Sequence, residues 1–75
     1  MTKTKVAMVL VESSHIKAIG YDEEIAQLHV EFKSGRTCVY HGVPVVVHEF
    51  FLSAPSPGRF FAQHVKGQYQ ATMQE

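Results

Sequence analysis

The sequence lacks the features that mark secreted and membrane proteins. Its one cysteine, Cys38, cannot form an internal disulfide, which is typical of a reducing compartment and excludes a disulfide scaffold. The longest apolar run, Val6 to Val11, is far shorter than the roughly 18 residues of a membrane-spanning helix. Glu12-Ser13-Ser14 after it provides no signal-peptide cleavage site. We therefore expect a cytoplasmic protein with no membrane contact.

The sequence also lacks an excess of charge of either sign. Seven basic and seven acidic side chains give a formal net charge of zero. Nucleic-acid-binding domains usually carry a basic excess on one face, so strong nonspecific binding is not expected. Five histidines modify this expectation, because they make the chain more cationic near pH 6 and below.

What is present is enough for one small globular domain. The hydrophobic content of 45% excludes a disordered chain, and 75 residues leave no room for a second domain. A chain of this length hides only about 60% of the surface that it exposes when unfolded. We therefore expect modest stability unless a second subunit adds buried area.

Four segments have the pattern of β-strands. Lys5–Val11 is apolar on both faces, which predicts a strand that is buried on both sides, with a second subunit as the simplest cover. His15–Tyr21 follows as a second strand. Leu28–Phe32 alternates strictly between apolar and polar residues, and Arg36–His41 returns from the loop Lys33-Ser34-Gly35.

The loop of this hairpin allows two registers. A two-residue turn would point Cys38 and Tyr40 away from the apolar face of the preceding strand, and a three-residue loop with a left-handed Gly35 would place them on that face. We favour the longer loop, because the shorter one would set Lys33 opposite Arg36, a pair of like charges. Tyr40 is then expected to pack toward the core.

Helical spacing follows the strands. One apolar stripe at intervals of three and four residues predicts a helix with Pro44 in its first turn and Pro55 at its end. The stripe consists of Val43, Val46, Val47, Phe50, Phe51 and Ala54. A second helix is expected from Ser56 as N-cap and Pro57 at its first position to Gly67, with Phe61 and Val65 pointing inward.

These elements predict an α+β domain. We expect a small antiparallel sheet of three to four strands followed by two helices on one face, with a short terminal strand at Gln68–Thr72. Residues 1–12 form an N-terminal strand or arm, and residues 13–72 form the domain. The apolar N-terminal strand predicts a homodimer, because an uncovered edge strand is prone to aggregate.

Candidate sites are few. Ser56, Gly58 and Arg59 surround a predicted helix N-terminus, which attracts anions. The outer face of the first helix offers a protein interface, predicted at Val45, His48 and Leu52. No cofactor or catalytic residue is expected, because Cys38 has the environment of a buried strand residue.

A series of short motifs follows one another along the chain in a recognisable order. They are Ser13-Ser14-His15-Ile16, Ile19-Gly20-Tyr21-Asp22, Leu28-x-Val30-x-Phe32-x-x-Gly35, Tyr40, Val43-Pro44, Ala54-x-Ser56-x-Gly58-x-Phe60-Phe61 and Tyr69. In these motifs the chain resembles the KTSC domain, a module named for the C-terminus of some lysyl-tRNA synthetases. The resemblance implies a fold more strongly than an activity, because most matched positions are apolar, Gly or Pro.

The synthetase context of the family implies RNA binding. The family's Tyr-x-Tyr is Cys38-Val39-Tyr40 here, so half of a base-stacking pair is missing, and Ala62 stands where the family often has Asn. The RNA hypothesis assigns the phosphate contacts to the basic side chains, with Tyr40 or Tyr21 stacking on bases. Those basic residues are Lys17, Arg36, Arg59 and Lys66. The alternatives are a protein-interaction module or small inhibitor of the kind that phages encode, acting through an apolar surface, and an oligomer that sequesters a small ligand.

The five histidines do not have the spacing of a zinc site. None stands at His-x-His or His-x-x-x-His spacing, and Cys38 and His41 are three residues apart on one predicted strand, so they point to opposite faces. We therefore predict that the purified protein carries no stoichiometric zinc. Elemental analysis that finds one zinc per chain would contradict this.

Overall fold

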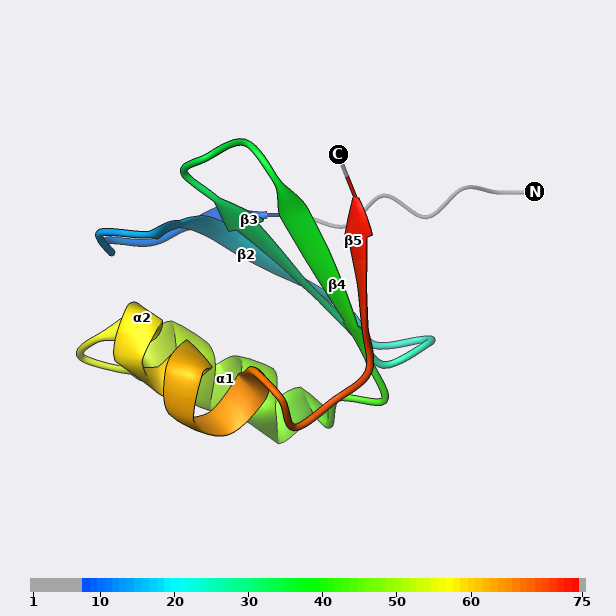
Figure 1. The fold of residues 1–75 in the computed structure, drawn as a ribbon. Helices are drawn as coiled ribbons and strands as arrows, with labels where there is room; N and C mark the ends of the chain where they lie inside the picture. The colour runs from blue at the N-terminus through cyan, green and yellow to red at the C-terminus, as the bar shows by residue number, and fades with distance from the viewer. Residues whose placement is uncertain (1–7, 75) are drawn as a thin grey trace.

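The computed structural model describes residues 8–74, with strands and helices in the order β-β-β-β-α-α-β. The strands are β1 (Val9–Leu10), β2 (Ile16–Asp22), β3 (Gln27–Phe32), β4 (Thr37–His41) and β5 (Ala71–Gln74). The helices are α1 (Val45–Ser53), α2 (Pro57–Phe60) and the π-helical turn η1 (Phe61–Val65), which continues α2. Figure 1 shows the two layers, with the helices on one side of the sheet. This confirms the predicted antiparallel sheet with two helices on one face.

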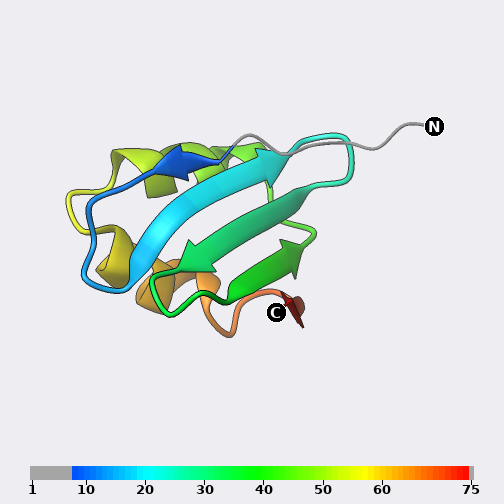
Figure 2. The ribbon, with the colours of Figure 1, turned by 90° about the horizontal axis from the view of Figure 1, so that it is seen from above.

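The sheet has five strands in the order β1-β2-β3-β4-β5, and every neighbouring pair is antiparallel. Figure 2 shows β1 at one edge of the sheet. The sequence pattern predicts that the terminal strand begins at Gln68, but in the structure it begins at Ala71. Gly67 has a φ of +80°, and the amide of Gln68 donates to the carbonyl of Val65 at 3.0 Å, so the chain is still turning there.

The hairpin between β3 and β4 has the predicted three-residue loop. The amide of Phe32 donates to the carbonyl of Arg36 at 2.8 Å, and Gly35 has a φ of +101°, a conformation that side chains disfavour. Leu28 then pairs with Tyr40, and Val30 pairs with Cys38. The register places all four side chains on the helix-covered face of the sheet, as predicted.

An irregularity in β2 was not predicted. Ile16 pairs with Phe32, but Ala18 pairs with Glu31, so the register shifts between Ile16 and Ala18. Such a bulge changes which side chains share a face. Ile16 and Ile19 both enter the core although they are three residues apart.

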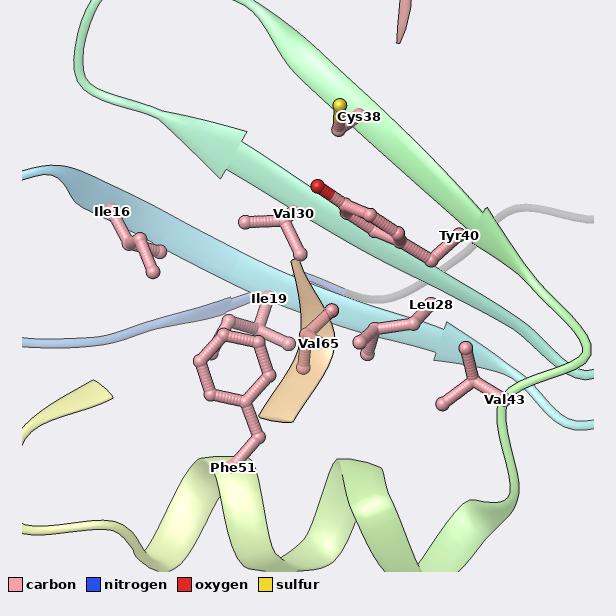
Figure 3. Close-up of a cluster of buried hydrophobic side chains, with 9 residues drawn as sticks. All are labelled: Ile16, Ile19, Leu28, Val30, Cys38, Tyr40, Val43, Phe51 and Val65. Carbon is pink, nitrogen blue, oxygen red and sulfur yellow. The ribbon is translucent and has the colours of Figure 1, made fainter. Parts of the chain in front are cut away.

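The core lies between the sheet and the helices (Figure 3). Phe51 of α1 and Val65 of η1 are fully buried against the β2–β4 side chains. Three further rings, Phe32, Phe60 and Phe61, pack around this core, and Phe61 meets both Phe32 and Tyr40 edge to face. The buried residues are Ile16, Ile19, Leu28, Val30, Cys38, Tyr40, Val43, Phe51 and Val65.

The first helix has the predicted position but a narrower buried face. Val43, Val47 and Phe51 face the core, whereas Val46 and Phe50 of the predicted stripe are 46% and 60% exposed. Phe51 also packs against Phe60 and Phe61 of the second helix, so the buried face of α1 is a ridge of residues four apart. Pro44 precedes the helix as N-cap, with extended backbone, instead of lying in its first turn.

The second helix begins as predicted, with Ser56 as N-cap and Pro57 at the first position, although the Ser56 side chain makes no cap hydrogen bond. Its C-terminal half is η1, closed by a 2.8 Å hydrogen bond from the amide of Lys66 to the carbonyl of Phe61. Phe61 and Val65 point inward, as predicted.

The N-terminal strand differs from its prediction. Of Lys5–Val11, residues 5–7 lie outside the described residues, and the strand comprises only Val9 and Leu10. Their side chains are 46% and 74% exposed, so the chain itself does not bury this segment on both faces. Within residues 8–74, no helix is long and apolar enough to cross a membrane.

Two histidines are half-buried, although the sequence had placed one of them, His48, on the outer face of the first helix. His48 stacks on Tyr21 with 5.1 Å between ring centroids, and Tyr21 donates its hydroxyl hydrogen bond to the carbonyl of Val43. The Nε2 atoms of His48 and His29 are buried without a hydrogen-bond partner among the described residues. Burial lowers the pKa of His48, and it lowers the pKa of His29 against a smaller opposing effect of Asp22.

These lowered pKa values predict a loss of stability in mild acid. An unfolded histidine has a pKa of about 6.5, so below that pH the unfolded chain binds more protons than the folded one. The free energy of unfolding is therefore expected to fall as the pH drops below about 6.5, and to be independent of these groups above about pH 7.5. Urea unfolding of the wild type and of a His29→Gln/His48→Gln double variant measures this. The double variant is expected to show a flatter pH profile, and an unchanged slope would contradict the assignment.

Candidate functional site

A groove of about 590 Å³ lies between the loop that joins β1 to β2 and the start of α2. One wall is the loop segment Glu12–Ile16, the other consists of Pro55–Arg59, Phe61 and Ala62, and Lys66 also lines the groove. The half-buried rings of Phe32 and Phe61 also line the groove. Residues from four separate parts of the chain therefore form one concave surface.

The two walls meet at Ser13 and Gly58. The Ser13 hydroxyl accepts hydrogen bonds from the amides of His15 at 3.3 Å and Ile16 at 3.4 Å, which hold the loop in a tight turn. A β-carbon on Gly58 would lie 3.2 Å from the Ser13 hydroxyl oxygen, closer than ordinary van der Waals contact. Gly58 therefore allows α2 to approach the loop.

The groove has a basic rim. Arg59 and Lys66 are exposed, and within residues 8–74 neither side chain forms an ion pair. Glu12 is the acidic side chain of the lining, and Ser13, Ser14 and Ser56 bring hydroxyl groups. The lining thus combines two cations with hydroxyl donors and two half-buried aromatic rings, and the cations and donors suit an anionic ligand.

The structure brings together four of the seven residues that the sequence predicted to bind nucleic acid or anions. Ser56, Gly58, Arg59 and Lys66 line the groove. The other three do not. Lys17 lies on β2, and its Nζ is 3.8 Å from Glu31 Oε2. Arg36 lies in the β3–β4 hairpin, and Tyr40 lies in the core.

Tyr40 does not offer a stacking surface. The residue is 5% exposed, and its ring packs against Phe61 with centroids 5.6 Å apart. Burial, followed by the hydrogen bond with Cys38, raises the pKa of Tyr40, so its hydroxyl stays protonated. Stacking of a base on Tyr40, as the sequence predicted, would require the ring to leave this buried position.

Sequence reasoning missed the opposite wall of the groove. Ser13, His15 and Phe32 were noted as parts of the family motifs but not as site residues. The sequence feature that could have indicated this wall is the presence of small and polar residues in two separate motifs, Ser13-Ser14 and Ser56-x-Gly58. Only the tertiary contact between Ser13 and Gly58 shows that these motifs form one site.

The predicted protein interface is retained in part. Val45 and Leu52 are exposed, at 46% and 37%. His48 is half-buried against Tyr21 and is not part of this exposed surface. Leu52 lines a second, smaller depression of about 290 Å³ together with Val9 and Val11 of the N-terminal segment.

Cys38 and the histidines do not assemble a reactive centre in the described part of the chain. The Cys38 thiol is buried and lies 3.7 Å from the sulfur of Met73. Among residues 8–74, no three His, Cys, Asp or Glu side chains lie close enough together to hold a metal ion. His41 instead contacts Gln27 at 3.2 Å and Thr72 at 3.0 Å on the open face of the sheet.

Residues 12–69 match the KTSC domain, and the chain belongs to this family. It is 43% identical over 61 residues to an uncharacterized protein of Stutzerimonas stutzeri, with 81% of this chain and 86% of that protein aligned. It is 38% identical to a KTSC domain protein of Yersinia pestis whose crystal structure superposes with a TM-score of 0.89 over 95% of this chain and all of that one.

The family segment also occurs inside a larger protein. The chain is 41% identical over 59 residues to a lysine–tRNA ligase of a Nostoc species, which covers 79% of this chain. The aligned segment spans only 10% of that ligase. The match therefore identifies a shared module and not a shared enzyme.

The contact between the groove walls predicts a coupled pair of substitutions. Gly58→Ala is expected to lower the free energy of unfolding by about 1 kcal/mol, because the added methyl group crowds the Ser13 hydroxyl. In a Ser13→Ala background the same change should be neutral or stabilising, because alanine favours the helix. A double-mutant cycle by urea unfolding measures the coupling. Additive effects would mean that the two walls do not touch.

Proposed function

We propose that this KTSC domain is a non-catalytic binding module whose groove holds a short stretch of single-stranded RNA. The observation that carries the proposal is that Arg59 and Lys66 line the same concave surface as Phe32 and Phe61. Sequence-tolerant single-strand sites combine cations for the phosphates with aromatic faces for the bases. The groove has both.

The number of cations limits the affinity. Two basic side chains on the rim neutralise about two phosphates, which for a single strand predicts a slope of about −1.4 in log K against log salt. The zero net charge of the chain provides no further attraction at long range. The module is therefore expected to bind weakly and to act where RNA is already held nearby.

The occurrence of the segment within a lysine–tRNA ligase supports RNA as the anion. That protein acts on a tRNA, as its name states, and it carries a segment 41% identical to this one. A weak RNA site is useful in such a protein, because a tethered site operates at a high effective concentration of its ligand.

A second candidate is a protein-interaction module or small inhibitor that acts through an apolar surface. The exposed residues of β1 and α1 favour it, since the apolar side chains Val9, Leu10 and Leu52 line the same depression. RNA and protein candidates use different surfaces, so the same set of variants separates them.

Titration of a labelled single-stranded RNA tests the proposal. Arg59→Gln and Lys66→Gln are each expected to weaken binding and to reduce the salt slope by about 0.7. Lys17→Gln is the control of equal charge, because Lys17 lies outside the groove beside Glu31, and it should have little effect. Binding should tighten from pH 7.5 to 6 as histidines gain protons.

Three outcomes would contradict the proposal. Equal losses in Lys17→Gln and Arg59→Gln would show that binding is diffuse and does not use the groove. Absence of binding at either pH would remove RNA as the ligand and leave the protein-interaction candidate. Tight binding at pH 8 with a steep salt dependence would show that more cations take part than the groove contains.

A further inference from the structure

The edge of the sheet at β1 has a free hydrogen-bonding side. The amide of Val11 donates to the carbonyl of Lys17 at 3.1 Å, and the register pairs Leu10 with Ala18 and Val9 with Ile19. In an antiparallel pair the backbone groups of successive residues point alternately toward the partner strand and away from it. The amide and carbonyl of Leu10 therefore point away from β2. Within residues 8–74, β1 has no strand on that side.

The side chains of this edge are apolar on both faces. Leu10 lies on the open face with Ala18 and is 74% exposed. Val9 lies on the helix-covered face with Ile19, where the depression of about 290 Å³ separates the N-terminal segment from Leu52 of α1. Figure 2 shows β1 lying over α1 at this edge of the domain.

The edge lacks three of the usual protections against strand pairing. Natural edge strands are often very short, as β1 is with two residues, or carry a charged residue, a proline or a bulge that hinders pairing with another chain. The segment Met8–Val11 has no charge and no proline, and the bulge of the sheet lies between β2 and β3 instead. An edge of this kind is suited to receive a strand.

We propose that the strand it receives is β1 of a second copy of this chain, arranged antiparallel about a two-fold axis at Leu10. Leu10 then exchanges both backbone hydrogen bonds with the partner subunit's Leu10, and Val9 lies opposite the partner subunit's Val11. The two sheets become one sheet of ten strands. The apolar side chains of the edge, with Leu52 beside them, lie along the seam.

Two features favour a second copy over an unrelated extended peptide. An antiparallel pair of identical strands is self-complementary, and an edge without charge brings no like charges together across the axis. A peptide strand would cover one edge and expose another of its own. The second copy exposes no new edge, because β1 is already paired with β2 on its far side.

The test is the mass of the full chain in solution, measured by light scattering and sedimentation over about a hundredfold range of concentration, since dimer population depends on concentration. The wild type is expected to run at twice the chain mass. Leu10→Lys places like charges across the axis, and Leu10→Pro removes only the outward amide, a change that edge strands tolerate. Both variants are expected to be folded monomers by circular dichroism. Ile25→Lys, at another exposed apolar position in the β2–β3 turn, should remain a dimer.

Hydrogen exchange provides a second measurement that does not need a variant. The Leu10 amide should exchange more slowly as the protein concentration rises, while the amides of the β2–β3 turn should not change. A wild type that is monomeric at every concentration would overturn the proposal. So would a Leu10→Lys variant that stays dimeric, or a Leu10 amide whose exchange rate is independent of concentration.

Discussion

The register of the β3–β4 hairpin determines the rest of this domain. Gly35 adopts a backbone conformation that places Phe32 opposite Arg36, and every later pairing along the hairpin follows from it. The result is a single apolar face with Leu28, Val30 and Tyr40 side by side. A shift of one residue would turn the Tyr40 ring to the open face and remove the surface on which Phe61 packs. Since Phe61 belongs to the second helix, the helix layer and the groove also depend on this loop.

The sequence was sufficient for the elements whose pattern is local. Strict alternation identified β3, and the like charges of Lys33 and Arg36 were enough to choose the loop. The helix α1 was recognised from spacing although Val45–Val47 favours a strand. Its exact buried face was not, because that depends on how the helix lies on the sheet. The same limitation applies to the bulge in β2, because it is visible only in the pairing of β2 with Glu31 on the neighbouring strand.

The site was predictable only on one side. A helix start with Ser56, Gly58 and Arg59 is visible in the sequence, and the structure places these residues in the groove. The other wall is a loop that has no chemical signature beyond two serines and a histidine. Histidine exposure was misjudged for a similar reason. His48 is on the outer side of an idealised helix, yet Tyr21 covers it from a neighbouring strand.

The contact between Ser13 and Gly58 joins two positions that are 45 residues apart in a chain of 75. The groove exists only when α2 packs against the β1–β2 loop, because its two walls come from these distant segments. A ligand that needs both walls favours the folded chain, and it raises the free energy of unfolding by an amount that grows with the ratio of its concentration to its Kd. For a domain of this size, the ligand and the fold are thermodynamically linked, so a heat-denaturation midpoint that rises with added ligand would be a direct readout of occupancy.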